Sequence, residues 1–163
     1  MHYKFLPSFV QRKGRITKSQ EDNLNNLRSY QITSHSQILS EKDNFKEIIL
    51  EIGFGNGESL VNLAKENPHN LYIGSEVYIA GIGQVLGAIR DNELTNIRLI
   101  TGDIRLFLDE INQPVFRVAD VTSTKVSDFL KTKDQSIDLR RLAHWSTLHN
   151  LVPQSYRVSL VID

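Results

Sequence analysis

Cysteine is absent from this 163-residue chain, which excludes a disulfide framework and a metal site built on thiolates. No apolar run approaches the length that is needed to cross a membrane. The N-terminus also lacks the continuous apolar segment of a signal peptide. We therefore expect a cytoplasmic protein with one hydrophobic core and no membrane partner. The oligomeric state is left open by the sequence.

Net charge is absent as well, because 19 Lys and Arg residues balance 19 Asp and Glu residues. This balance argues against a general polyanion binder, but it conceals a local asymmetry. Residues 1–20 carry basic side chains and no acid, with Tyr3, Phe5 and Phe9 interleaved among them. Such a segment can bind RNA phosphates and stack on bases, or it can be a solvated terminus.

Residues 1–44 are expected to form a basic N-terminal arm and a short helix. Thr17, followed three residues later by Gln20, is a capping-box pattern, which predicts a helix from about Thr17 to Arg28. Residues 29–44 are rich in Ser, Thr and Asn and are expected to form a loop.

From Phe45 onward, strand-like and helix-like segments alternate. The segment 45–53 is rich in Ile, which is typical of a buried strand, and 70–77 and 96–103 are two further predicted strands. Apolar residues at helical spacing in 57–67 and 80–93 predict the two intervening helices. This β-α-β-α-β order implies a parallel sheet with right-handed crossovers. We expect residues 45–163 to form an α/β domain of the Rossmann-like type, with helices flanking the sheet.

The second predicted helix contains Gly81, Gly83 and Gly87, each of which costs about 1 kcal/mol relative to alanine. We expect these glycines to let the helix lie close to the sheet. A short helix is expected at 104–111. From about residue 113 the periodicity weakens, and we expect a divergent part with strands at 114–120, 136–139 and 156–163 and a helix at 125–133.

Three glycines stand at every second position directly after the first predicted strand: Gly53, Gly55 and Gly57. Glycine allows a tight strand-to-helix turn and lets a ligand approach the backbone closely, and a helix N-terminus offers unpaired N–H groups. The spacing fits neither G-x-G-x-x-G nor a Walker A loop. With Glu51 it reads E-x-G-x-G-x-G, the first motif of the methyltransferases that use S-adenosyl-L-methionine (AdoMet).

Two further acids follow the next two predicted strands. Glu76 closes the second strand, where an acid can accept both hydroxyls of a ribose. Asp103 follows the third strand, where an acid can receive an adenine amino group. Separately, they could be a solvated strand end and a helix N-cap. Together they predict an AdoMet pocket made by residues 51–57, by Glu76 with Val77, and by Asp103 with Ile104.

The segment R-x-G-R-x-T-x-x-Q runs from Arg12 to Gln20, and the glycine motif, "IGSEV" and "NIRLITGD" follow it. With these motifs, residues 8–111 resemble the bacterial tRNA (guanine-N7-)-methyltransferases. The resemblance implies transfer of a methyl group from AdoMet to a guanine of the tRNA variable region, without a metal. It places the AdoMet-contacting acids on Glu51, Glu76 and Asp103. It also favours tRNA contact by the basic arm, through Arg12, Lys13, Arg15 and Lys18.

The C-terminal part departs from that family. Its F-P-D-P-W segment, the basic cluster after it and its T-D segment are absent from this sequence. We expect the fold to be incomplete at its C-terminal end, and no catalytic residue is assigned; Asp120, Asp128 and Asp138 are the candidate acids. Two hypotheses follow: a tRNA guanine-N7 methyltransferase, or a non-catalytic or truncated relative that binds AdoMet or RNA. An AdoMet enzyme acting on another small substrate is a third.

Overall fold

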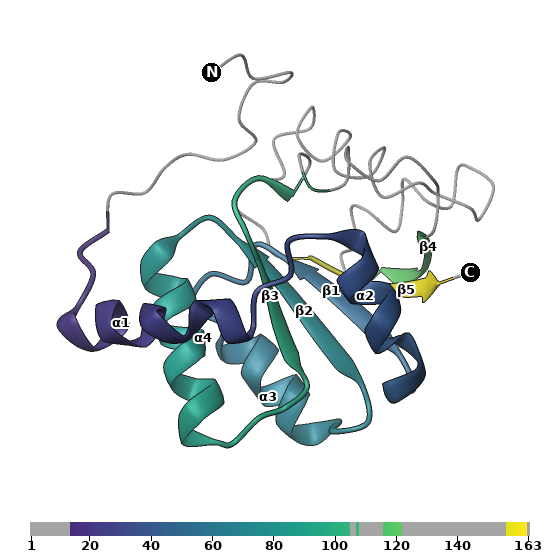
Figure 1. Ribbon diagram of the computed structural model, residues 1–163, viewed down its shortest axis with the longest axis horizontal. Helices are drawn as coiled ribbons and strands as arrows, with labels where there is room; N and C mark the ends of the chain where they lie inside the picture. The colour runs from purple at the N-terminus through teal and green to yellow at the C-terminus, as the bar shows by residue number, and fades with distance from the viewer. Residues whose placement is uncertain (1–13, 105–106, 108–115, 122–155, 163) are drawn as a thin grey trace, which may run out of the picture.

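The computed structural model describes residues 14–104, 107, 116–121 and 156–162 (Figure 1). In chain order its elements are α1 (Lys18–Asn23), the 3-10 helix η1 (Leu24–Ser29), α2 (His35–Glu41), the 3-10 helix η2 (Lys42–Asn44), β1 (Ile48–Ile52), α3 (Glu58–Glu66), β2 (Leu71–Glu76), α4 (Ile79–Asp91), β3 (Ile97–Thr101), β4 (Phe116–Val121) and β5 (Tyr156–Ile162). The expected helix at 125–133 and strand at 136–139 lie outside the described residues.

The strands form one sheet in the order β3-β2-β1-β5-β4. β1, β2 and β3 are parallel, which confirms the predicted α/β arrangement of the first three strands. Ile52 lies opposite Ser75, and Glu76 lies opposite Thr101, so the carboxyl ends of these strands are aligned. The two later strands were also expected, but β5 runs antiparallel to β1, and β4 runs antiparallel to β5. The sheet as a whole is therefore mixed.

Helices cover both faces of the sheet. α3 and α4 share a core with Tyr72 of β2 and with Ile97 and Leu99 of β3. Arg98 must point to the other face because successive strand residues alternate. There its Nη2 pairs with Oε1 of Glu41 in α2 at 2.7 Å. α2 therefore lies on the face opposite to α3 and α4.

The segment before β1 agrees only in part with the sequence predictions. The capping box at Thr17 and Gln20 is confirmed: each backbone N–H donates to the other side chain. The loop predicted for residues 29–44 is wrong, because α2 and η2 lie there. A second capping box explains the difference: the Ser34 N–H donates to Gln37 Oε1 at 3.0 Å, and Ile38 is buried in the core. Polar composition concealed this helix, since only one of its residues is fully buried.

The glycines of α4 allow close packing, but not against the sheet as predicted. A Cβ at Gly81 would overlap the carbonyl oxygen of Gly55, and one at Gly83 would overlap the carbonyl oxygen of Gln20. A Cβ at Gly87 would lie 2.6 Å from Nδ2 of Asn23. The close approach is therefore to the glycine turn and to α1, which lies alongside α4 (Figure 1).

Candidate cofactor site

The glycine turn between β1 and α3 has three left-handed residues. Gly53, Gly55 and Gly57 have φ values of 72°, 63° and 76°, a region that other L-residues rarely occupy. Gly57 is the N-cap residue of α3, and a Cβ there would overlap Val85 of α4. At Gly55, by contrast, no heavy atom lies within 4 Å of the Cβ position. The turn is thus packed at its helix end and open at its middle.

The amide groups of these glycines are used within the protein. Gly53 N–H donates to the Ser75 carbonyl at 2.8 Å, and Gly57 N–H donates to the Phe54 carbonyl at 3.0 Å. Gly55 N–H donates to Oε2 of Glu76 at 2.6 Å. The N–H groups of all three glycines therefore have partners within the protein. They set the shape of the turn, and the open side of Gly55 is what a ligand can approach.

Glu76 organises the end of β2. Besides Gly55, its carboxylate accepts from the backbone N–H groups of Val77 at 2.8 Å and Tyr78 at 3.1 Å. These three donors fix the half-buried side chain in one orientation. An ionised carboxylate has about four lone-pair positions, so one acceptor position is left for a further donor. A ribose hydroxyl is a donor of the right kind.

The other two acids also lie at the carboxyl ends of their strands, as predicted. Glu51, next to the last residue of β1, is only 1% exposed, whereas Asp103, two residues after β3, is half-buried. Gly102 precedes Asp103 with a φ of 97°, and its N–H donates to the Glu76 carbonyl at 3.3 Å. This bond ties the turn after β3 to the end of β2. Ile104 follows as a buried residue.

The three acids therefore end three adjacent strands, and their ligand contacts stay predictions. Burial distinguishes them. Glu76 and Asp103 keep exposed surface that a ligand can contact, while Glu51 has almost none.

Sequence reasoning missed Gln31, which lies in the stretch expected to be a loop. Residues 30–32 extend the sheet beside β3: Ile32 N–H donates to the Leu99 carbonyl, and Leu99 N–H donates to the Tyr30 carbonyl, both at 2.8 Å. The Gln31 side chain then donates from Nε2 to Oγ1 of Thr101 at 2.7 Å, close to the turn that holds Asp103. An isolated bridge of this length has no periodicity that a sequence could reveal.

The basic arm enters the described part of the chain beside this site. Arg12 and Lys13 lie outside the described residues, whereas Arg15 and Lys18 are described and exposed. A Cβ at Gly14 would overlap the hydroxyl of Tyr78, the residue whose N–H donates to Glu76. Gly14 of the arm therefore lies against Tyr78, two residues after the proposed ribose acid Glu76.

The residues with assigned positions contain no cluster of three or more His, Cys, Asp or Glu side chains suited to a metal ion. Among them no helix combines the length and the apolar character that a membrane crossing requires.

Residues 45–118 match a family model described as "Putative methyltransferase". The tRNA (guanine-N(7)-)-methyltransferase of Francisella philomiragia is 39% identical over 103 residues, which cover 60% of this chain and 45% of the relative. The enzyme of the same name from Photobacterium profundum is 42% identical over 60% of this chain and 42% of the relative. This part of the chain is similar in sequence to the tRNA (guanine-N(7)-)-methyltransferases. The resemblance predicted from the sequence is thereby confirmed.

The relationship covers part of each protein. A further relative of that name, from Neorickettsia sennetsu, is 34% identical over 69% of this chain and 49% of its own length. The chain thus spans less than half the length of each of these three curated relatives. Among solved structures, an antibiotic-related methyltransferase aligns over 80% of this chain and 96% of its own at 14% identity, with a TM-score of only 0.38.

Proposed function

We propose that this chain binds AdoMet at the glycine turn and is the cofactor-binding part of an enzyme that methylates a tRNA guanine at N7. One observation carries the proposal: the Glu76 carboxylate is held by three backbone N–H groups beside the open middle of the glycine turn. Its free acceptor position suits a ribose hydroxyl, and the missing Cβ of Gly55 leaves room for a ligand. The family relationship supplies the name of the cofactor and of the substrate.

The residues present fit AdoMet by chemical type. Glu76 would hold the ribose, and Asp103 would receive the adenine amino group beside Val77 and Ile104. The turn made by Gly53, Gly55 and Gly57 would allow close approach of the rest of the cofactor. AdoMet, when bound, supplies a methyl group on a sulfonium sulfur, which is already an activated donor. The protein's contribution is then mainly to align the guanine with that methyl group.

tRNA is the proposed partner, which also implies a cytoplasmic location. Arg15 and Lys18 are exposed and can contact phosphates, Arg15 directly follows Gly14, which lies against Tyr78, and Arg12 and Lys13 belong to the same basic segment. No catalytic residue is proposed. Of the candidate acids, Asp120 lies in β4, and Asp128 and Asp138 lie outside the described residues.

The sequence after residue 112 favours a second function, which is binding of AdoMet and RNA without catalysis. This part of the sequence lacks the F-P-D-P-W segment and the basic cluster that would face the guanine and the RNA. A chain that has the cofactor motifs but lacks these segments can bind AdoMet and RNA without transferring the methyl group.

Calorimetry with AdoMet and with S-adenosylhomocysteine tests the binding that both functions share. We expect measurable heat and a thermal shift; a folded sample that gives neither at millimolar ligand contradicts both. Incubation with radiolabelled AdoMet and unmodified tRNA, followed by nucleoside analysis, then separates them. Label at N7 of guanine supports the enzyme, and binding without transfer supports the second function.

A further inference from the structure

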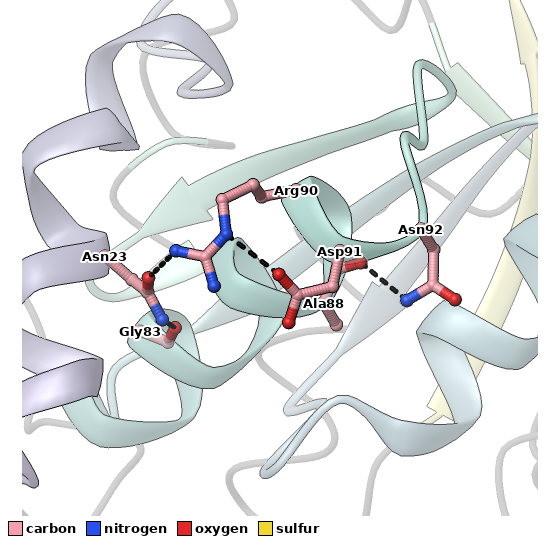
Figure 2. A network of polar contacts seen from close by, with 6 residues as sticks. All are labelled: Asn23, Gly83, Ala88, Arg90, Asp91 and Asn92. Atoms are coloured by element: carbon pink, nitrogen blue, oxygen red, sulfur yellow. Dashed lines mark hydrogen bonds and ion pairs between the residues drawn. The ribbon is translucent and has the colours of Figure 1, made fainter.

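A polar clamp joins α1 to α4 (Figure 2). Asn23, the last residue of α1, is only 6% exposed. Its Nδ2 donates to the Gly83 carbonyl at 3.0 Å, and its Oδ1 accepts from Nη1 of Arg90 at 2.8 Å. Both ends of the amide therefore have a partner on the same helix. We call these contacts the Asn23 clamp.

The surface of α4 is shaped to receive α1. Gly83 and Gly87 have no side chains, and a Cβ on either would collide with Gln20 or Asn23. Gln20 adds a contact from Nε2 to Oε1 of Gln84 at 3.3 Å. α1 has only six residues, far too few for a helix to be stable alone. The position of α1 therefore depends on its contacts with this surface of α4.

α4 connects the surface that receives α1 to the candidate cofactor site. At its N-terminal end, Gly81 packs on the carbonyl of Gly55, and its N-cap residue Tyr78 donates its N–H to Glu76. Tyr78 is also the residue against which Gly14 of the arm lies. One helix thus contacts the glycine turn near its start and α1 along its middle.

Because the Asn23 clamp is polar, it sets the orientation of α1 on α4 as well as attaching the helix. An apolar side chain at position 23 would also bury α1 against α4. A buried amide with a donor and an acceptor partner permits a single arrangement, because any shift leaves a buried polar group unpaired. The exposed Arg15 lies just before α1, and the exposed Lys18 is its first residue, so the orientation of α1 also fixes the positions of these two charges.

We propose that Asn23 is a positioning residue for RNA: by fixing α1 on α4, it holds Arg15 and Lys18 beside the Tyr78 edge of the cofactor site, where they contact phosphates of the substrate. The inference rests on the proposed function, since it needs an RNA substrate. In this view the Asn23 clamp fixes the position of the two basic side chains. Loss of the clamp should therefore lower RNA affinity and leave cofactor affinity unchanged.

The first experiment measures the position of α1 without RNA. Because the chain has no cysteine, spin labels can be placed uniquely at Ser19→Cys in α1 and Asn62→Cys in α3, both exposed positions. We expect one narrow distance distribution, which Asn23→Ala broadens. Asp91→Asn is the matched control: it removes the surface ion pair of Arg90 and leaves the clamp. An unchanged distribution in Asn23→Ala overturns the inference.

The second experiment is a double-mutant cycle on tRNA affinity between Asn23→Ala and the pair Arg15→Ala with Lys18→Ala. We expect Asn23→Ala to weaken tRNA binding by about tenfold and AdoMet binding by less than about twofold. In the Asn23→Ala background, removing the two charges should then cost little more. Additive losses overturn the inference, because they mean that the charges act without the clamp.

Two further outcomes keep the result decisive. If Asn23→Ala does not fold, Arg90→Ala replaces it, since it removes one clamp contact from an exposed position; a smaller loss with the same non-additivity supports the inference. If the unmodified chain binds AdoMet but shows no tRNA affinity, the RNA part of the proposed function fails. The positioning role then fails with it, whatever the labels report.

Discussion

The backbone N–H of Gly55 donates to Oε2 of Glu76 at 2.6 Å across 21 residues of sequence. This bond joins the glycine turn after β1 to the acid that ends β2. It makes the orientation of the proposed ribose acid depend on the shape of the turn, so the two predicted parts of the site form one unit.

Replacement of Glu76 with Ala is expected to weaken AdoMet binding by about 1.5–3 kcal/mol, the range for hydrogen bonds to a charged group. Calorimetry measures this, with Glu58→Ala as the control because Glu58 is an exposed acid just after the turn. Wild-type protein should also prefer S-adenosylhomocysteine over its 2′-deoxyribose analogue, and Glu76→Ala should lose that preference. An unchanged affinity would mean that the ribose is held elsewhere.

Replacement of Gly57 with Ala is expected to destabilise the protein more than replacement of Gly55. Both changes place a side chain at positive φ, at a cost of about 1–2 kcal/mol. Only the Gly57 change adds an overlap with Val85, for a total of about 3 kcal/mol. Urea unfolding gives the order, and Val85→Ala should relieve part of the Gly57→Ala loss. Equal losses at the two glycines would contradict the packing described here.

Replacement of Asn96 with Ala is expected to lower the free energy of unfolding by about 2–3 kcal/mol. Asn96 is buried, and its Nδ2 donates to the carbonyls of Ala64, Asn67 and Asn70, which closes the end of α3. Asn92→Ala is the matched control, because Asn92 donates to one helix carbonyl from an exposed position and should cost about 0.5 kcal/mol. Similar midpoints for both variants in urea would refute this role.

Methylation of tRNA by this chain alone is expected to be absent or far below that of a full-length relative, while AdoMet binding persists. Transfer needs the guanine in near-attack geometry, and misplacement by about 1 Å can cost on the order of 100-fold. The F-P-D-P-W and T-D segments, to which the resemblance assigns the guanine contacts, do not occur in these 163 residues. Parallel assays with radiolabelled AdoMet test this. Robust labelling at guanine N7 would show that the C-terminal part supplies a substitute.

Several features followed from the sequence by itself, because they depend on local physics. The period of apolar residues gave the three parallel strands and the two helices between them. The glycine spacing predicted a tight strand-to-helix turn, and the positions of the strand ends placed Glu76 and Asp103 at one edge of the sheet. The capping box at Thr17 gave the start of α1.

Tertiary structure alone decided which surfaces meet. The glycines of α4 were predicted to pack on the sheet, yet they contact α1 and the glycine turn. A glycine in a sequence indicates a close contact but does not identify the segment that makes it. The direction of β5 beside β1, the bridge of Gln31 to β3 and the passage of Gly14 over Tyr78 join segments far apart in the chain. Such contacts have no local period, since burial and hydrogen bonding select their partners only after the chain has folded.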